Sequence, residues 1–228
     1  GIALFHVPGP VMIKRVSGYR IGKGMSFFMF AGELARSVGP IVVLGAVSLW
    51  GLEGTYRLIP VGLFASFLLY LRFRKIPISD AFRKKDKESD IRSTLKKHYP
   101  IFIQITGIIF FTSMIKSALT TFLPTYITST GSSLWAGGIS LAIYQLAGAA
   151  GTFFSGTISD KLGRRKTLLI MTLISTVLMW LYTTLDESFA VPLLILLGLF
   201  MFAAAPVLLA VVNEIDSEHS AFLNGIYM

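Results

Sequence analysis

Three ionisable residues lie inside otherwise apolar segments of this 228-residue chain. Glu33 and Arg36 are three residues apart, so they share one face of a helix, and Lys116 lies midway along the apolar segment 100–127. A charged side chain at the centre of a bilayer costs about 3 kcal/mol on insertion scales and is seldom kept without a role. We therefore predict that Glu33 is a protonatable carboxylate that couples substrate movement to a proton gradient. Arg36 would tune the pKa of this carboxylate. Lys116 would attract an anionic substrate. The alternative is a structural Glu33–Arg36 ion pair, with Lys116 reaching toward a membrane face.

A second candidate site is the short basic turn at 156–166, with the sequence Gly-Thr-Ile-Ser-Asp-Lys-Leu-Gly-Arg-Arg-Lys. Gly156 would let another helix approach closely, and Gly163 would permit a sharp turn. Asp160 could face a helix N-terminus or an arginine, where a negative charge is stabilised. This combination suits a gate between helices, whereas a loop that only sets membrane topology would need neither glycine nor aspartate. The candidate gating residues are Gly156, Asp160, Lys161, Gly163, Arg164, Arg165 and Lys166.

Further polar residues lie within or beside the apolar segments. Gln104 and Gln145 could line a cavity or join neighbouring helices through hydrogen bonds. His6 could relay protons or simply stand at a helix end. Gly39-Pro40 is similar to the Gly-Pro pair in the fifth helix of drug/proton antiporters, and this resemblance implies a helix kink at these two residues.

Several classes of protein have little support. The chain has no cysteine, and it contains no His-Glu-x-x-His, no nucleophile elbow and no cluster of histidines with carboxylates. We therefore expect no metal, no cofactor and no enzymatic activity. The glycines around Lys23 lack the spacing of an ATP-binding loop. The net charge of +9 is spread between apolar segments, so the predicted anionic partner is lipid and not nucleic acid.

The composition places these residues in a membrane. Hydrophobic residues make up 54% of the chain and charged residues only 14%, and the apolar segments approach the ~20 residues that cross a bilayer. We predict an all-α polytopic membrane protein. Residues 1–13 would be the tail of an earlier span and 221–228 the start of a later one, so the chain is expected to be a fragment. The six complete predicted spans are 25–48, 56–73, 100–127, 134–158, 167–185 and 189–212.

Lysine and arginine alternate between the predicted connections. They concentrate at 14–23, 72–97 and 161–166, and are absent from 50–55, 128–135 and 186–188. Basic connections stay on the cytoplasmic side, which predicts the orientation in the cell (inner) membrane. The acidic stretch 213–220 is cytoplasmic by parity, and Glu214 there could pair with a basic loop or end in solvent. The long polar segment 76–98 is either a linker between domains or a helical cap on the membrane surface.

The turn at 156–166 resembles the cytoplasmic-loop signature of the major facilitator superfamily, Gly-x-x-x-Asp-Arg/Lys-x-Gly-Arg-Arg/Lys-Arg/Lys, at every constrained position. In that family the signature follows the second and the eighth of twelve helices, and its placement here resembles the later copy. The resemblance implies an incomplete twelve-helix fold. Residues 1–75 would hold the tail of the fourth helix with the fifth and sixth, 76–98 the linker, and 99–228 the seventh to tenth helices and the start of the eleventh.

A second resemblance concerns function. Phe5-His6-Val7-Pro8, Gly24-Met25-Ser26-Phe27-Phe28 and Gly39-Pro40 are similar to patterns of the fosmidomycin-resistance group of efflux transporters. This resemblance implies a proton-coupled antiporter that exports small drug-like or anionic compounds by alternating access, with protons and a small molecule as partners. We expect it to act as a monomer. The alternatives are a proton symporter that imports sugars or organic acids, and a membrane sensor or scaffold that transports nothing.

Overall fold

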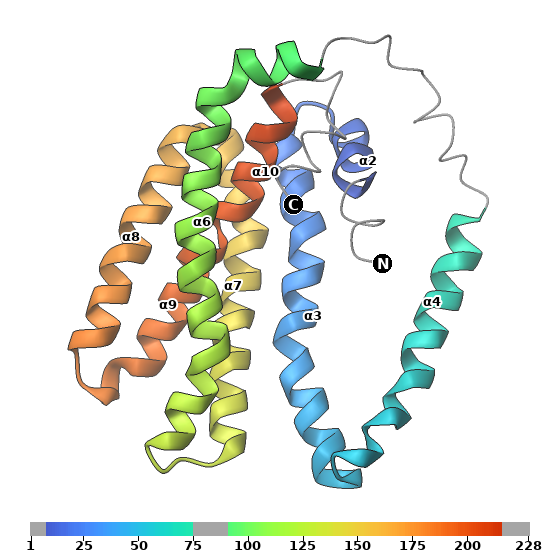
Figure 1. Ribbon diagram of the computed structural model, residues 1–228, viewed down its shortest axis with the longest axis vertical. Coiled ribbons are helices and arrows are strands. Elements are labelled where there is room, and N and C mark those ends of the chain that lie inside the picture. Colours follow the sequence, from blue (N-terminus) through green and yellow to red (C-terminus); the bar gives the residue numbers. More distant parts are fainter. Residues whose placement is uncertain (1–7, 75–90, 216–228) are drawn as a thin grey trace. The chain divides into compact units, whose positions relative to one another are not determined.

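The computed structural model describes residues 8–74 and 91–215, and every regular element in these ranges is helical (Figure 1). The prediction of an all-α protein is therefore confirmed for the part of the chain that is described. The elements are α2 Pro8–Ser17, α3 Ile21–Trp50, η1 Glu53–Leu58, α4 Ile59–Phe73, α6 Ile91–Ser129, α7 Leu134–Leu162, α8 Arg164–Thr184, η2 Glu187–Phe189, α9 Ala190–Phe202 and α10 Ala204–Ile215.

Five stretches of helix are long and apolar enough to cross a membrane: Ile21–Trp50, Glu53–Leu71, Ile103–Ser129, Arg164–Thr184 and Ala190–Glu214. The sixth predicted span, at 134–158, forms the 29-residue helix α7 but does not belong to this set. Its glycine, serine and threonine residues lower its hydropathy. These small residues are buried against other helices, so α7 is shaped for contact with protein more than for contact with lipid.

The chain divides into two compact units. The first unit comprises residues 1–41 and 97–228, and the second comprises residues 42–96. One boundary falls within α3, just after Gly39-Pro40, and α3 continues through Pro40 as a helix. The assignment of 1–75 and 99–228 to two halves of a transporter stays a prediction. Residues 76–90 of the predicted linker lie outside the described residues, and the remainder of the linker is helical because α6 begins at Ile91.

The second unit holds the end of α3, η1 and α4. Every residue of α4 from Ile59 to Leu71 is exposed, and most of these side chains are large and apolar. A helix that is apolar on all sides is built for a membrane or for the centre of a larger bundle. At its start, the guanidinium of Arg57 lies 5.6 Å from the centroid of the Trp50 ring.

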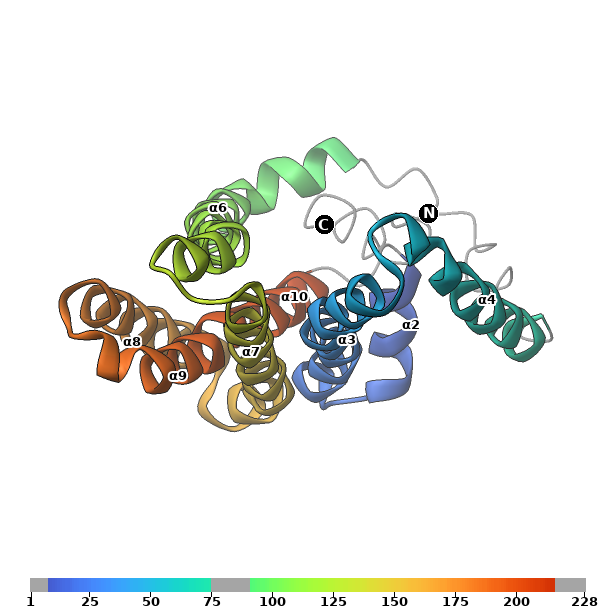
Figure 2. The same cartoon turned by 90° about the horizontal axis from the view of Figure 1, so that it is seen from below.

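The core of the first unit is centred on α9, which lies between α7 and α8 and packs most extensively against α7 (Figure 2). A Cβ atom added at Gly198 of α9 would collide with the backbone of α7, so the two helices touch through their main chains. Tyr144, Leu197 and Phe202 are fully buried in this core, and Leu119 and Leu123 of α6 pack onto it.

The predicted span 189–212 is divided into α9 and α10 at Ala203. Pro206 explains the division, because proline has no backbone N–H and leaves the carbonyl of Phe202 without its helical partner. The hydroxyl of Thr152 in α7 donates to that carbonyl at 3.3 Å. A neighbouring helix therefore satisfies the backbone group that the break leaves open.

Candidate functional site

Glu33, Arg36 and Lys116 lie together in the first unit and form what we call the mid-span cluster. Both cations bind the same carboxylate oxygen: Arg36 Nη1 lies 3.0 Å and Lys116 Nζ 2.9 Å from Glu33 Oε1. The Glu33 side chain is only 4% exposed, whereas the Lys116 side chain is 26% and the Arg36 side chain 60% exposed. Helices α3 and α6 thus bring together three charges that are separated by up to 83 residues in sequence.

The carboxylate of Glu33 is only half satisfied. Its second oxygen, Oε2, is buried and has no hydrogen-bond partner among the described residues. A buried carboxylate oxygen without a donor carries the cost of its lost hydration. The cluster therefore contains one anion with two cations, and Glu33 Oε2 is the atom at which a further donor group would bind.

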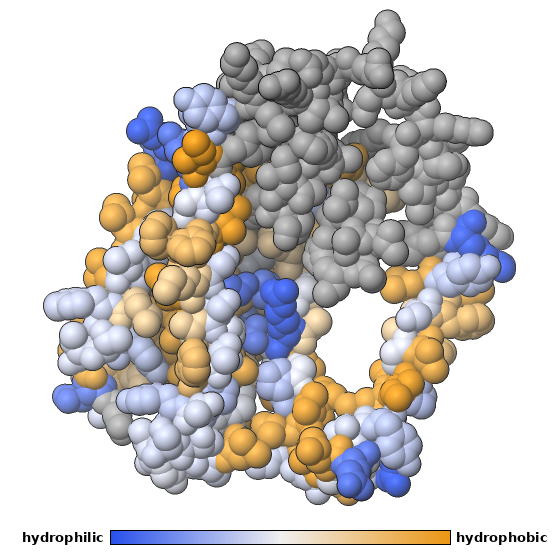
Figure 3. Space-filling view, viewed as in Figure 1, coloured by the Kyte–Doolittle hydropathy of each residue, from blue (hydrophilic) through white to orange (hydrophobic). Residues whose placement is uncertain are grey.

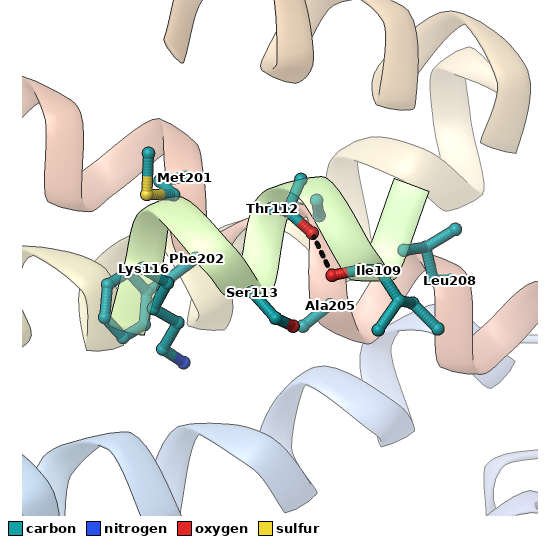
Figure 4. Close-up of a pocket in the computed structure, with 9 residues that line it drawn as sticks. Ile109, Thr112, Ser113, Lys116, Met201, Phe202, Ala205 and Leu208 are labelled. Atoms are coloured by element: carbon teal, nitrogen blue, oxygen red, sulfur yellow. Dashed lines mark hydrogen bonds between the residues drawn. The ribbon is translucent and has the colours of Figure 1, made fainter. Parts of the chain in front are cut away.

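An aromatic ring also contacts Lys116. The ammonium is 3.8 Å from the centroid of the Phe202 ring, which is close enough for a cation–π interaction (Figure 4). Phe202 is the last residue of α9 before the break, and it stacks edge-on against Tyr144 with a centroid separation of 5.2 Å. The hydroxyl of Tyr144 donates to the sulfur of Met201 at 3.2 Å.

A pocket of about 80 Å³ opens beside Lys116, between α6 and the α9–α10 break. Ser113 and Lys116 line it from α6, and Phe202, Ala205 and Leu208 line it from the opposite side. Figure 4 shows the ammonium of Lys116 and the hydroxyl of Ser113 pointing to the same side of α6. On the face seen in Figure 3, hydrophilic side chains gather between α6 and α3 within a largely apolar surface.

The second site is the loop network, formed by Asp160, Arg164, Ser159 and Glu214 with the first turn of α3. Asp160 Oδ1 accepts from the backbone N–H of Gly22 at 3.2 Å, and Oδ2 accepts from that of Lys23 at 3.0 Å. The carboxylate therefore sits at the positive end of a helix, one of the two environments predicted for it. Arg164 provides the other environment, with Nη2 2.7 Å from Asp160 Oδ1.

Arg164 also connects the loop to the end of α10. Its Nη2 lies 2.6 Å from Glu214 Oε1, and its Nη1 donates to the hydroxyl of Ser159. Nearby, the ammonium of Lys14 in α2 donates to the backbone carbonyl of Asn213. Three of the four segments that sequence analysis placed on the cytoplasmic side, 14–23, 161–166 and 213–220, therefore meet at one end of the first unit, and Glu214 pairs with the basic loop.

Two glycines shape this network. Gly163 ends α7 and begins α8 with φ +89° and ψ 148°, a conformation that residues with a Cβ rarely adopt. Gly156 faces α3 so closely that an added Cβ would collide with the backbone of Gly22. Its N–H donates to the hydroxyl of Ser26 at 2.8 Å. Both glycines thus stand where the sequence analysis required a turn and a close approach.

The whole chain, residues 1–228, matches the family model described as Major Facilitator Superfamily. The chain belongs to the major facilitator superfamily. Members of this superfamily are membrane transporters and not enzymes, so the prediction of a multi-pass transporter is confirmed at that level. No curated protein and no solved structure matches the chain. The resemblance to the fosmidomycin-resistance group stays a prediction.

Within this major facilitator chain, the other predicted site residues are dispersed. Lys161, Arg165 and Lys166 are exposed around the loop network. Gln104 is exposed on α6, about three helical turns from Lys116, so it does not join the mid-span cluster. Gln145 is buried on α7, and its Oε1 has no hydrogen-bond partner among the described residues. His6 lies outside the described residues.

Sequence reasoning missed Phe202, Thr152 and the division of the span between α9 and α10 of this major facilitator chain. A signal for the division was present, because Pro206 interrupts an otherwise apolar segment. Neither Phe202 nor Thr152 carries a comparable signal. Phenylalanine is frequent in this chain, and a single threonine in a helix commonly donates to its own helix.

Proposed function

We propose that this chain is a proton-coupled secondary transporter that exports small drug-like or anionic compounds from the cell by alternating access. The observation that carries the proposal is Glu33, whose buried carboxylate binds two cations through one oxygen, while its other oxygen has no donor among the described residues. Membership of the superfamily supports transport, and an ionisable group near the middle of a span supports a role for protons.

The direction of transport rests on different evidence. The resemblance of the Gly-Met-Ser and Gly-Pro patterns to the fosmidomycin-resistance group supports export through the inner membrane. The second candidate is import of organic acids together with a proton. The ion pair between Glu33 and Lys116 favours this candidate, because protonation of the carboxylate would release an ammonium for an anionic substrate.

The loop network supports the alternating-access part of the proposal. Asp160 joins the end of α7 to the start of α3, and Arg164 joins the start of α8 to the end of α10. These four helix ends cannot separate without breaking charge-assisted hydrogen bonds. We propose that the loop network holds this end of the transporter closed and opens when the helices move apart.

The test of proton coupling is transport into vesicles that contain the full-length protein. Glu33→Gln keeps the shape of the side chain but cannot exchange a proton, so we expect it to abolish transport driven by a pH gradient while preserving the amount of folded protein. Glu53→Gln is the matched control, because Glu53 lies in η1 outside the mid-span cluster. Unchanged coupling in Glu33→Gln would eliminate the proposed role.

The test of direction uses the same vesicles with a substrate gradient and a pH-sensitive dye. Export by antiport moves protons opposite to the substrate, whereas symport moves both the same way. We expect opposite movement. Movement in the same direction would replace export with the second candidate, and failure of a folded protein to transport any candidate compound would favour a sensor or scaffold.

A further inference from the structure

We propose that a cationic pocket between the start of α3 and the end of α7 binds the phosphate of an anionic phospholipid, whose acyl chains cover the aromatic side chains next to it. We call it the interfacial pocket, and its lining residues are Tyr19, Arg20, Lys23, Thr157, Asp160 and Lys161. The inference requires only that the chain crosses a membrane, which its apolar helices and its family support. It is independent of the proposed proton coupling and of the direction of transport.

The first step of the argument is the cavity itself. Its volume is about 430 Å³, which lies in the usual range of ligand sites, whereas the pocket beside Lys116 has only about 80 Å³. Half of the lining residues precede or begin α3, and the other half belong to the last turns of α7. The close approach of Gly22 and Gly156 joins these two helix ends. The interfacial pocket is therefore formed by two helices in contact.

The second step is the charge of the lining. Three cations and one carboxylate give a net charge of +2 at neutral pH. Asp160 is already compensated, because it accepts two backbone N–H groups and pairs with Arg164. Arg20, Lys23 and Lys161 form no ion pair with any residue that the structure describes. Cations gathered in this way attract an anion, and phosphate oxygens accept hydrogen bonds from both arginine and lysine.

The third step is the depth of the interfacial pocket in the membrane. Tyr19 is 85% exposed on the turn between α2 and α3. Tyrosine and basic residues at the ends of spans are typical of the boundary between membrane and water. This turn and the basic loop both belong to the predicted cytoplasmic side, where the membrane surface carries anionic lipids. A phospholipid phosphate would therefore lie at the level of the three cations.

The fourth step is the apolar surface beside the cations. Phe27 follows Lys23 by one helical turn, and the Lys23 ammonium lies 5.9 Å from the centroid of its ring. Phe153 of α7 packs edge-on against Phe27 at 5.1 Å and against Phe30 at 5.2 Å. Phe27 and the neighbouring Phe154 remain exposed. An acyl chain would bury these rings, whereas a free phosphate would leave them uncovered, so we assign the interfacial pocket to a lipid.

The consequence concerns the contact between the two helices. Lys23 belongs to α3 and Lys161 to α7, so one phosphate between them would bridge the same helix ends that Asp160 joins. A ligand that contacts both helices stabilises the arrangement in which they touch. By reciprocity, the lipid binds more weakly once α3 and α7 separate.

The experiment measures the unfolding temperature of the purified full-length protein in detergent during titration with dioctanoyl phosphatidylglycerol. Dioctanoyl phosphatidylcholine is the control with the same chains and no net charge, and glycerol phosphate is the control with an anionic group and no chains. We expect a saturable rise with phosphatidylglycerol, a much smaller rise with phosphatidylcholine and none with glycerol phosphate at the same concentration.

Each other result with these three ligands would overturn the inference. An equal rise with phosphatidylcholine would show that the protein binds the chains without recognising the charge. An equal rise with glycerol phosphate would assign the interfacial pocket to a soluble phosphate compound. No rise with any of the three ligands would show that the pocket binds neither.

Variants then locate the site. Lys23→Gln/Lys161→Gln should weaken the apparent Kd for phosphatidylglycerol by about thirtyfold, because each cation near an anionic lipid contributes roughly fivefold. The change at Lys23 preserves the backbone N–H that Asp160 accepts. Arg165→Gln/Lys166→Gln is the matched control, since it removes the same charge from the same loop at exposed residues that do not line the interfacial pocket. Its Kd should stay close to that of wild type, and equal weakening in both double variants would overturn the inference.

A second pair of substitutions covers the case in which the glutamine variant does not fold. Lys23→Arg/Lys161→Arg keeps both positive charges and should keep the rise in unfolding temperature with phosphatidylglycerol. Loss of this rise in a folded arginine variant would contradict recognition of the phosphate by charge.

Discussion

The mid-span cluster and the loop network each hold a carboxylate with an arginine three or four residues further along the chain and groups from other helices, yet the two carboxylates are satisfied differently. Asp160 accepts two backbone N–H groups at the start of α3 and an ion pair from Arg164. Glu33 receives both of its cations on one oxygen and has a buried second oxygen without a described partner. A fully satisfied carboxylate holds helices in place, whereas a half-satisfied one can exchange its partners at lower cost.

The difference also appears in the surroundings. The donors to Asp160 are backbone N–H groups at the start of α3, so the helix itself fixes their direction whether or not the carboxylate is bound. The donors to Glu33 are flexible side chains, which can turn toward a substrate or toward solvent. The comparison predicts that changes in the mid-span cluster alter coupling and binding, and that changes in the loop network alter how tightly one end of the protein closes.

The largest expected effect is on stability in the mid-span cluster. Lys116→Gln leaves the Glu33 carboxylate with only the largely exposed Arg36, and removal of one partner from a buried pair costs about 3–5 kcal/mol. Thermal unfolding of the purified protein measures the loss. The double variant Glu33→Gln/Lys116→Gln should recover most of it, and equal losses in the single and double variants would show that the pair is not coupled.

A smaller effect is expected from Asp160→Asn in the loop network. The amide can still accept a hydrogen bond from the α3 backbone, but it loses the charge that favours a helix N-terminus, which costs about 1–2 kcal/mol. The chain has no cysteine, so a single Thr157→Cys beside the network can be labelled with a thiol reagent. Labelling should become faster in Asp160→Asn and stay unchanged in Asp186→Asn, an exposed residue between α8 and η2. Equal labelling rates in all three proteins would argue against a gate.

The smallest effect is expected from Glu214→Gln. This side chain is 39% exposed, and ion pairs of this kind contribute about 0–1 kcal/mol. Screening by salt should remove most of the contribution, so the difference in unfolding temperature from wild type should shrink at about 1 M salt. A large loss of thermal stability that persists at high salt would show that the Glu214 ion pair behaves as a buried pair, as that of Glu33 does.

The sequence predicted the helical class, the glycine turn and the environment of Asp160, because each depends on local patterns of residues. The Glu33–Arg36 pair follows from helical spacing in the same way. The ion pair of Glu33 with Lys116 does not, since it joins residues 83 positions apart that belong to two different helices, α3 and α6. The α9–α10 break could be predicted only in part from local sequence. Pro206 signalled it, but the Thr152 hydroxyl that satisfies the open carbonyl comes from another helix.

Helix α10 begins beside one of these sites and ends at the other. The helix begins at Ala204, directly after the break at Ala203, and the ring of Phe202 before that break contacts the Lys116 ammonium. Near its other end, Glu214 binds Arg164. Twelve helical residues span about 18 Å, and a helix changes length very little. A tilt of α10 about the Ala203 break would therefore displace Glu214 at the far end, so that a change beside the Lys116 ammonium and a change at the α7–α8 turn are mechanically one movement.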